Sequence, residues 1–371
     1  MGALETRDVI VESPIVHIAS LGCAARTMQQ DGGMPLLPAP RLIDPAAVPA
    51  LRWGVIGTGI ADRFVHALHA HTGQRAVAVT ARDADKTRAF ADAHGIGRVH
   101  RSVADLVGDP EVDVVYVATP HPLHREQALA AIAARKHVLI EKPIALSAVD
   151  ATEILAAGRA AGVLVAEAMW TRYLPQADVI RQVLAAGTLG EIDLVRADFG
   201  SLVPFDPTSR MFDPALGGGA MLDLGVYIIA FASSIIGPPS TIRSVGTLAP
   251  TGVDDSATIA LKTDAGAQAA LTTTFGAVTP VEATVFGSRG RLDVLAPFYG
   301  PTGLRLQLHG ADEEVWHDDA LPTVHDGLGY QATAFASFVG EGLVESPLHP
   351  HDEVVSVLAT IDEVRRQIAA D

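Results

Sequence analysis

The sequence is poor in cysteine, in positive charge and in long apolar runs, and each shortage excludes a class of protein. Its 371 residues include one cysteine, Cys23, which excludes an internal disulfide and a thiolate metal cluster. The formal net charge of −16 repels phosphate backbones and argues against a nucleic-acid partner. The longest apolar runs, such as residues 112–118 and 228–236, are well short of a membrane span. We therefore expect a cytoplasmic protein that binds neither nucleic acid nor membrane.

The first fifty residues predict an arm rather than a folded unit. Glu5, Asp8 and Glu12 stand where an export signal would be basic, so no such signal is predicted. Five prolines between positions 35 and 49 disfavour both a helix and a sheet ladder. Residues 1–50 are therefore interpreted as a Pro-rich arm that either stays mobile or lies extended on another surface.

From Leu51 onward, short apolar strands alternate with helical segments. We expect strands at residues 53–56, 77–80, 112–118, 137–140 and 163–166. Helices are expected at residues 61–71, 83–94, 122–134 and 148–161. The strand at 112–118 is apolar throughout, which is typical of the buried middle of a parallel sheet. This alternation predicts an α/β chain whose residues 51–172 form an N-terminal Rossmann domain with a doubly wound parallel sheet.

After residue 172 the pattern changes to helices and a run of closely spaced strands. Helices are expected at residues 174–186, 220–236, 330–340 and 352–369, and strands at 242–247, 257–262, 267–275, 281–286, 291–294 and 304–308. Short turns such as 264–266 and 288–290 join these strands, which favours antiparallel pairing. Residues 173–371 are therefore predicted to form a C-terminal α+β domain with a mostly antiparallel open sheet.

A glycine turn follows the first expected strand directly. Gly57 permits a tight turn, and Gly59 lets the backbone approach a pyrophosphate at the N-terminus of the next helix. Together with Ile60 and Ala61, these glycines are predicted to bind a dinucleotide cofactor. The third small residue of this motif should stand at position 62, where the sequence has Asp62. Its carboxylate is expected to crowd, or to repel, the phosphates.

The end of the second expected strand indicates which dinucleotide is bound. NAD-specific enzymes place an acid there for the ribose hydroxyls, whereas this chain has Arg82. A guanidinium at this place pairs well with a 2′-phosphate, so NADP is favoured and NAD is the alternative. A purely structural interpretation stays open, in which Arg82 is solvated and Asp83 caps the next helix.

Two further segments carry groups suited to chemistry. Glu141 and Lys142 follow the strand at 137–140, and the carboxyl ends of parallel strands face the ligand crevice, so Lys142 is expected near the nicotinamide. Within residues 217–227, Asp223 and Tyr227 are four positions apart and project from one face of an apolar helix. A buried acid and phenol need partners. The alternative is that both residues only stabilise this helix and the core around it.

These segments resemble a known enzyme family. Glu141-Lys142-Pro143 and residues 167–175 and 217–227 are similar to the glucose–fructose oxidoreductase, inositol dehydrogenase and rhizopine-catabolism (Gfo/Idh/MocA) family. They are closest to its dimeric dihydrodiol dehydrogenase and NADP-dependent xylose dehydrogenase branch. Residues 252–255, 287–290 and 345–347 match that branch too. The resemblance covers roughly residues 52–369, and only the arm and the glycine turn depart from it.

The resemblance implies a role for individual residues. Lys142 corresponds to the family's lysine, Asp223 to its acidic companion and Tyr227 to its proton carrier. Trp170 and Arg172 would line the substrate pocket. The loop beside the nicotinamide ribose would comprise Thr119, Pro120, His121 and His124. The family also implies a small-molecule substrate, a sugar or cyclic polyol of the aldose or trans-dihydrodiol type, and a homo-oligomer formed through the C-terminal sheet.

The chemistry of alcohol oxidation agrees with these assignments. Hydride removal requires that the hydroxyl proton leave as the carbonyl forms. A phenol is a poor base at neutral pH, but a neighbouring ammonium stabilises phenolate and lowers its pKa. Lys142 is therefore expected to activate Tyr227 and to polarise the substrate oxygen, with Asp223 orienting Lys142 or a sugar hydroxyl. The reverse assignment stays open, with Asp223 as the base and Tyr227 only positioning.

Two other functions compete with a freely exchanging dehydrogenase. In one, a tightly held cofactor is recycled between two sugars and the N-terminal arm wraps a partner subunit. In the other, suggested by Asp62, the chain is a non-catalytic NADP-binding sensor or interaction protein. No metal is expected, because His66, His69 and His71 have no carboxylate at ligand spacing and hydride transfer needs none.

Overall fold

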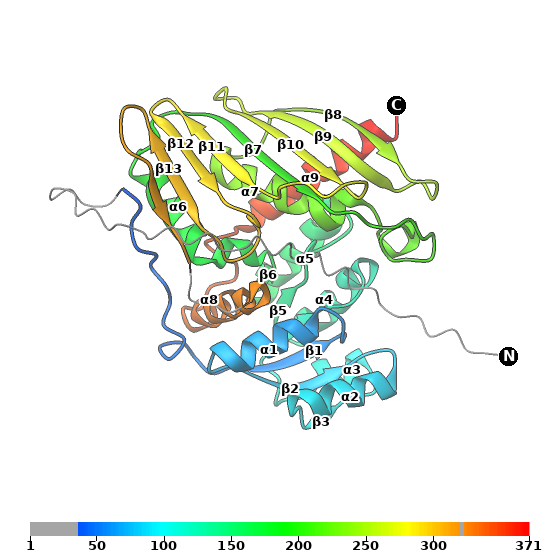
Figure 1. Cartoon of the computed structure of the whole chain (residues 1–371). Helices are drawn as coiled ribbons and strands as arrows, with labels where there is room; N and C mark the ends of the chain where they lie inside the picture. Colours follow the sequence, from blue (N-terminus) through cyan, green and yellow to red (C-terminus); the bar gives the residue numbers. More distant parts are fainter. Residues whose placement is uncertain (1–35, 319–322, 371) are drawn as a thin grey trace, which may run out of the picture.

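The computed structural model describes residues 36–318 and 323–370. Cys23 and most of the predicted arm lie outside these residues. The described chain contains two β-sheets, one in each half of the sequence, with helices packed around the first and beneath the second (Figure 1).

The first sheet has six parallel strands in the order β3-β2-β1-β4-β5-β6. They are β1 (Arg52–Ile56), β2 (Arg75–Thr80), β3 (Arg98–Val99), β4 (Val114–Val117), β5 (His137–Ile140) and β6 (Val165–Glu167). The predicted Rossmann sheet is confirmed, and β3 is a short edge strand that was not predicted. All four residues of β4 are buried, as expected for the middle of a parallel sheet.

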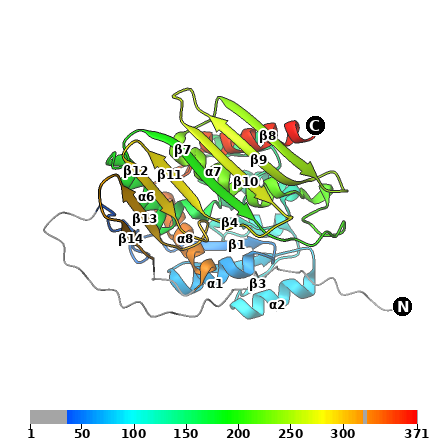
Figure 2. The ribbon, with the colours of Figure 1, turned by 45° about the horizontal axis from the view of Figure 1, so that its top comes forward.

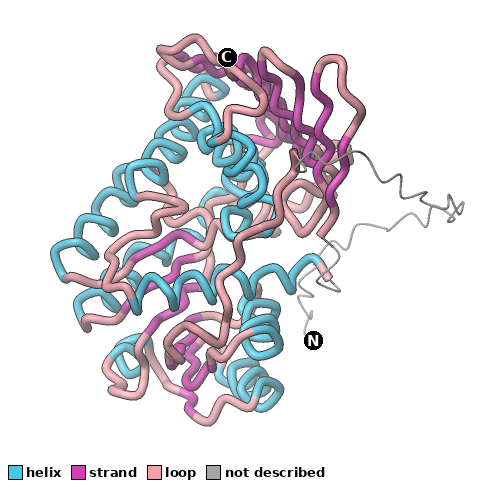
Figure 3. The backbone as a smooth tube through the Cα atoms, turned by 90° about the vertical axis from the view of Figure 1, so that its left-hand side faces the viewer, coloured by secondary structure: helices cyan, strands magenta, loops and turns pink. Residues whose placement is uncertain are grey.

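Helices cover both faces of this sheet (Figure 3). They are α1 (Ala61–His71), α2 (Ala84–His94), α3 (Val103–Val107), α4 (His124–Ala133), α5 (Ala148–Ala161) and, from much later in the chain, α8 (Leu328–Gly340). The ring of the fully buried Trp53 in β1 lies 5.5 Å from that of Phe64 in α1 and 5.4 Å from that of Phe335 in α8. Helix α8 therefore completes the first core, where each such aromatic pair contributes about 1 kcal/mol beyond burial.

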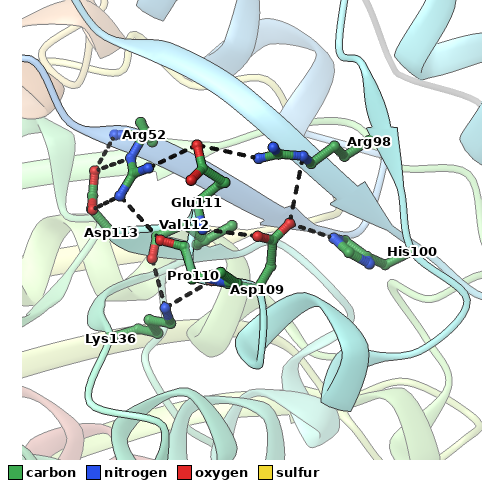
Figure 4. Close-up of polar contacts among 9 residues, drawn as sticks. All are labelled: Arg52, Arg98, His100, Asp109, Pro110, Glu111, Val112, Asp113 and Lys136. Carbon is green, nitrogen blue, oxygen red and sulfur yellow. Dashed lines mark hydrogen bonds and ion pairs between the residues drawn. The ribbon is translucent and has the colours of Figure 1, made fainter.

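An ionic network holds the amino ends of these strands (Figure 4). The Arg52 guanidinium donates to both carboxylate oxygens of Asp113, at 2.9 and 2.7 Å. Lys136 Nζ donates to the carbonyls of Asp109 and Val112, at 2.9 and 2.7 Å. These contacts anchor the loop before β4 at the edge opposite to the one that carries the predicted site.

The second sheet has eight strands in the order β14-β13-β12-β11-β7-β10-β9-β8. They are β7 (Ile192–Gly200), β8 (Thr241–Leu248), β9 (Asp254–Lys262), β10 (Gln268–Thr274), β11 (Ala283–Gly287), β12 (Gly290–Val294), β13 (Leu304–Leu308) and β14 (Glu314–Trp316). Only β7 and β10 pair in parallel; every other pair is antiparallel. The predicted mostly antiparallel sheet is confirmed, but β7 and β14 were not predicted.

Helices lie against one face of the second sheet. Helix α7 (Val226–Ile236) packs on β7 and β10, α9 (His351–Ile368) packs on β8 and β9, and α6 (Pro175–Ala185) lies behind the other end of the sheet. Among the described residues no helix covers the opposite face, which is turned to the viewer in Figure 2. This sheet is therefore open on one side. Association through that face stays a prediction, as does the domain division at residue 172.

Residues 36–50, the described part of the arm, contain no helix or strand. They run from the second sheet to β1 of the same molecule (Figure 1). The backbone N–H groups of Leu36 and Leu37 each donate to Glu314, at 3.0 Å. Arg41 binds Asp178 of α6 through its backbone N–H at 2.7 Å and its guanidinium at 3.0 Å. This segment therefore bridges the two halves of one molecule.

Among the residues that the structure describes, one helical stretch, Pro214–Ile236, is long and apolar enough to pass the length and composition test for a membrane span. Yet 72% of its most apolar window is buried inside the protein. This is the pattern of a core helix, because such a helix is apolar on every side when protein surrounds it.

Candidate active site

The glycine turn has the geometry that a dinucleotide requires. Gly57 has φ +103°, and a Cβ there would lie 2.4 Å from the carbonyl oxygen of Ala118, so only glycine fits. A Cβ on Gly59 would meet no atom within 4 Å. Ile60 is exposed, and Ala61, the first residue of α1, is fully buried. Open space therefore adjoins a helix N-terminus, which suits a pyrophosphate.

Asp62 is engaged with the neighbouring helix. Its Oδ1 lies 2.9 Å from Nε2 of His94, the last residue of α2. Asp62, the residue that departs from the glycine motif, thus joins α1 to α2. One of its carboxylate oxygens has a partner within the protein.

The loop after β2 contains both features that the sequence suggested. Asp83 accepts hydrogen bonds from the backbone N–H groups of Asp85 and Lys86, at 3.1 and 3.0 Å, and so caps α2. Arg82, one residue earlier, is exposed at the carboxyl end of the strand. The cap fixes the course of the chain while the guanidinium reaches solvent, so capping and phosphate binding are compatible.

The loop after β4 is tied to the loop after β5 by a buried histidine. His124 Nε2 lies 2.8 Å from the carbonyl oxygen of Thr119, and its Nδ1 lies 3.0 Å from that of Pro143. Pro120 precedes a short 3₁₀ turn, η1 (His121–Leu123). Burial lowers the pKa of His121 to about 3, with His124 and Lys142 acting in the same direction. His121 is therefore neutral at physiological pH.

The structure brings Lys142, Asp223 and Tyr227 together. Lys142 Nζ donates to the backbone carbonyl of Asp223 at 2.7 Å and lies 3.5 Å from its carboxylate Oδ1. The same nitrogen lies 4.6 Å from the centre of the Tyr227 ring. These three residues come from two distant segments of the chain, and their contact was the main structural requirement of the sequence-based hypothesis.

Charges in this group support one another. Burial opposes a charge on Lys142, but Tyr227, Asp223 and Glu141 together raise the pKa of its ammonium above the ordinary value. Burial would raise the pKa of Asp223, but Lys142, followed by Arg210 and His121, lowers it to about 2. At neutral pH the group therefore contains an ammonium and a carboxylate.

The electrostatics of Tyr227 differ from the sequence-based expectation. Lys142 does lower the pKa of the phenol, and so does a hydrogen bond from Trp170, but burial is the larger effect and the net shift is upward. The reason is that desolvation penalises phenolate more than one ammonium stabilises it. In this structure Tyr227 is a protonated phenol at neutral pH.

The helix that carries these residues begins irregularly. Residues Met221–Gly225 form a π-helical turn, η4, and the regular helix α7 starts only at Val226. The helix expected at residues 220–236 is present, but its first turn is π-helical and only the part from Val226 is an α-helix. The backbone N–H of Met221 donates to Asp254 at 2.6 Å, which anchors the start of the turn. Despite the altered register, Asp223 and Tyr227 both reach Lys142.

The two expected pocket residues have different partners. Trp170, in the 3₁₀ turn η2 (Trp170–Tyr173), donates its indole N–H to the Tyr227 oxygen at 3.1 Å. Arg172 Nη2 instead binds Glu353 of α9, at 2.5 Å. The structure thus places Trp170 in the group around Tyr227 and gives the Arg172 guanidinium a partner within the protein, so its contact with substrate stays a prediction.

Glu141 is held inside the fold. The Tyr116 hydroxyl donates to Glu141 Oε1, and Glu141 Oε2 accepts the backbone N–H of Lys142 at 3.1 Å. Burial raises the pKa of Glu141, although Tyr116 and Lys142 act against this shift. The geometry suits a residue that holds the backbone of Lys142 in place, and its contact with a cofactor stays a prediction.

Sequence reasoning missed several residues at this site. The Tyr299 ring stacks on Phe199 with centroids 4.6 Å apart and lies 5.7 Å from the Tyr227 ring. Arg210 Nη1 lies 3.6 Å from the Asp223 carboxylate. Tyr299 and Arg210 lie in irregular segments, and Phe199 lies in the unpredicted strand β7, so no local pattern pointed to them.

Two histidines of α1 have hydrogen-bond partners within the protein. His69 Nε2 accepts the backbone N–H of Ala76 at 3.0 Å, and His71 Nε2 lies 2.8 Å from Asp326. Within residues 36–318 and 323–370, no group of three or more metal-binding side chains is close enough to hold an ion.

Comparison with known proteins agrees with this architecture. The family description "Oxidoreductase family, NAD-binding Rossmann fold" matches residues 51–169, and "GFO/IDH/MocA C-terminal domain" matches residues 178–293. Trans-1,2-dihydrobenzene-1,2-diol dehydrogenase from Homo sapiens is 34% identical over 332 residues, covering 86% of this chain and 97% of that protein. The enzyme of the same name from Bos taurus is 35% identical over 333 residues, with the same coverage.

Two solved structures are similar in three dimensions. A 3-ketoreductase from Actinomadura kijaniata, in complex with NADP and TDP-benzene, is 28% identical with a TM-score of 0.75 and covers 86% of this chain and 98% of its own. Levoglucosan dehydrogenase, in complex with NADH and levoglucosan, has a TM-score of 0.80 at 19% identity over 87% of this chain and 98% of its own, which bears on the fold alone. The chain belongs to the Gfo/Idh/MocA family of oxidoreductases, and its first half is their NAD-binding Rossmann domain.

Proposed function

We propose that this chain is an NADP-dependent oxidoreductase that transfers a hydride to or from a CH–OH carbon of a sugar or cyclic polyol. The observation that carries the proposal is the Lys142–Tyr227 contact, which lies beyond the carboxyl ends of the Rossmann strands, where ligands of this fold bind. The cofactor, when bound, supplies or accepts the hydride. Lys142 and Tyr227 act on the substrate oxygen. Lys142 polarises this oxygen, and Tyr227 donates a proton to it or accepts a proton from it.

Lys142 polarises the substrate oxygen. An ammonium has three N–H donors. Two of them face Asp223: one its backbone carbonyl, at 2.7 Å, and one its carboxylate, at 3.5 Å. The third donor is left for a substrate oxygen on which negative charge develops. Asp223 thereby orients the ammonium.

Tyr227 carries the proton. Its oxygen accepts the Trp170 indole N–H, and a phenol oxygen that accepts one bond still has its own O–H to donate. In reduction the phenol protonates the carbonyl oxygen as hydride arrives, and in oxidation the phenolate removes the hydroxyl proton. Because the pKa of Tyr227 is raised, neutral pH favours the reduction direction. Asp223 is the weaker candidate for the base, since its pKa near 2 makes it reluctant to accept a proton.

The choice of NADP rests on Arg82. Its exposed guanidinium follows β2, where a 2′-phosphate would lie in a Rossmann site. The 3-ketoreductase was solved with NADP and levoglucosan dehydrogenase with NADH, so cofactor preference varies among similar folds. The acid that would favour NAD is replaced here by a cation.

The substrate class follows from the walls of the site. Trp170, Phe199 and Tyr299 present aromatic surface next to Tyr227, which suits a ring with an apolar face and hydroxyls at its edge. The relatives that act on trans-1,2-dihydrobenzene-1,2-diol favour a cyclic diol, with aldoses as the second class. We further propose a cytoplasmic homo-oligomer that associates through the open face of the second sheet.

A substrate panel tests the proposal. Purified protein is incubated with trans-dihydrobenzenediol, several aldoses and inositol, each with NADP and with NAD, and reduced nicotinamide is followed by its absorbance. Turnover with NADP that is lost in Lys142→Met is the expected result. NADP binding without turnover on any substrate would instead indicate the sensor function. Nucleotide that survives extensive dialysis would indicate recycling of a tightly held cofactor between two sugars.

A further inference from the structure

A buried charge cluster lies against the loop that carries Lys142. It consists of Glu167 from β6, Arg172 from η2, His349 from the segment before α9, and Glu353 from the first turn of α9. The side chains of Glu167 and His349 are each 1% exposed. The mechanism above uses none of these contacts, so the cluster needs its own explanation.

His349 lies between two carboxylates. Its Nε2 is 2.8 Å from Glu167 Oε2 and its Nδ1 is 3.6 Å from Glu353 Oε2. A neutral imidazole has one N–H and one lone pair, whereas an imidazolium has two N–H groups. A neutral ring would therefore turn a lone pair toward one of the two carboxylates, and only the imidazolium suits both.

Charge balance leads to the same state. Glu353 is paired with Arg172 at 2.5 Å, which leaves the charge of Glu167 to be balanced. An uncompensated charge in a protein interior is costly, and a protonated His349 makes the four-residue cluster neutral. Burial lowers the pKa of His349, but the hydrogen bond with Glu167 and the nearby Glu353 carboxylate outweigh burial and raise it above the ordinary value.

The cluster reaches Lys142 through the backbone. The second oxygen of Glu167, Oε1, accepts the N–H of Ile144 at 2.8 Å, and Ile144 is two residues beyond Lys142. On the same loop, the carbonyl of Pro143 faces His124 at 3.0 Å. Glu167 thus holds the loop with one oxygen and His349 with the other, so the orientation of its carboxylate depends on the imidazole.

We propose that His349, as an imidazolium between Glu167 and Glu353, is a positioning residue that holds the Lys142 loop through the Glu167–Ile144 hydrogen bond. The predicted effect of His349 on catalysis rests on the proposed function, whereas its predicted effect on the Lys142 loop does not. The groups that face it are Glu167 from β6, Arg172 from η2 and Glu353 from α9. Because its pKa is raised, the stabilising charge is complete below the ordinary value of 6.5 and is lost as pH rises through the raised value.

Hydrogen–deuterium exchange tests the effect on the loop without any turnover. In the full-length protein, His349→Gln should speed exchange of the Ile144 amide at least about tenfold, because its acceptor is no longer held in place. His351→Gln is the matched control: His351 is equally buried and close in sequence, but its ring contacts the carbonyl of Val165 and the Arg159 guanidinium. Unchanged exchange at Ile144 in His349→Gln, or an equal increase in both variants, would overturn the proposal.

Nitrogen NMR of the histidine rings tests the charge directly. The signal that disappears in His349→Gln should show both ring nitrogens predominantly protonated at pH 6.5, where an ordinary imidazole is about half protonated. A mostly neutral ring at pH 6.5 would contradict the inference even if the enzyme proved active.

Kinetics test the consequence for catalysis. In His349→Gln, kcat should fall roughly tenfold to a hundredfold, as expected for a slightly misplaced catalytic group, while the Kd for NADPH stays within about twofold. Replacing Glu353 by Gln as well removes the unbalanced charge and should recover part of the loss. If wild type has no turnover, the proposed function fails while exchange and NMR still decide the role of His349. Active enzyme with unaltered kcat in His349→Gln would refute the positioning role alone.

Discussion

The ammonium nitrogen of Lys142 lies 4.6 Å from the centre of the Tyr227 ring and donates to the backbone carbonyl of Asp223 at 2.7 Å. The Lys142 ammonium therefore contacts Asp223 in the π-helical turn and Tyr227 in α7, the two residues of this helix that the proposed chemistry uses. This contact joins the loop after β5 of the Rossmann half to the second half of the chain. The reacting oxygen is expected at their junction.

Replacing Lys142 should abolish catalysis while leaving the fold intact. In Lys142→Met, the donor to the developing oxyanion is lost, and we expect kcat/KM to fall roughly a thousandfold. Lys136→Met is the control, since Lys136 precedes the same strand but binds carbonyls at the opposite edge of the sheet. It should lower the melting temperature and keep kcat. Similar kinetic losses in both variants would show that Lys142 acts only structurally.

Cofactor choice should depend on Arg82. Loss of a charged hydrogen bond to the 2′-phosphate costs about 2 kcal/mol, so Arg82→Gln should raise the Kd for NADP about thirtyfold and leave the Kd for NAD unchanged. Fluorescence titration of both cofactors measures this. Arg88→Gln provides the control, because Arg88 lies on α2, the helix that follows Arg82, and pairs with Asp85 at 3.7 Å. A parallel change for NADP and NAD would exclude phosphate recognition by Arg82.

The indole of Trp170 should tune the Tyr227 phenol. Its N–H stabilises phenolate, so Trp170→Phe should raise the pKa of Tyr227 further. Because a neutral hydrogen bond contributes about 1 kcal/mol, oxidation at fixed pH should slow about fivefold, measured as kcat at saturating alcohol. Trp316→Phe, in β14, should have no such effect. An unaltered kcat in Trp170→Phe would show that this bond does not act on the phenol.

Asp223 should stabilise the fold in a pH-dependent way. Its folded pKa, about 2, is below the ordinary 3.8, so its stabilisation is complete above the ordinary value and is lost as pH falls from about 4 to about 2. At pH 7 the shift corresponds to about 2 kcal/mol. Urea titration of wild type and Asp223→Asn should give that difference at pH 7 and a shrinking one below pH 4. A difference independent of pH would contradict the ion pair with Lys142.

Local patterns predicted much of the fold because strand periodicity and turn residues act over short distances. Gly57, Arg82 and Lys142 were placed at one edge because each lies within two residues of the carboxyl end of a strand of the same parallel sheet. Strand β7 was missed although Val195 and Ala197 alternate inward, since charged residues interrupt its apolar pattern. Its parallel partner β10 is the third strand after it in the sequence, so no hairpin signal marked it.

The rest of the site depends on tertiary structure. Tyr299 stands in a loop with no periodicity, and only the packing of its ring on Phe199 brings it beside Tyr227. The upward pKa shift of Tyr227 also escaped prediction, because the depth of burial is not visible in a motif. His349 likewise meets Glu167 across 182 positions, which no local spacing reveals.

The pH dependence of alcohol oxidation tests the central claim most directly. Below the raised pKa of Tyr227, the phenolate fraction grows tenfold per pH unit, so log kcat/KM should rise with a slope near 1 between about pH 6 and pH 9. Tyr299→Phe should keep this slope, while Tyr227→Phe should lose it and be slower by a factor of about 100 or more. An equal slope in Tyr227→Phe would mean that another group removes the proton and would contradict the account.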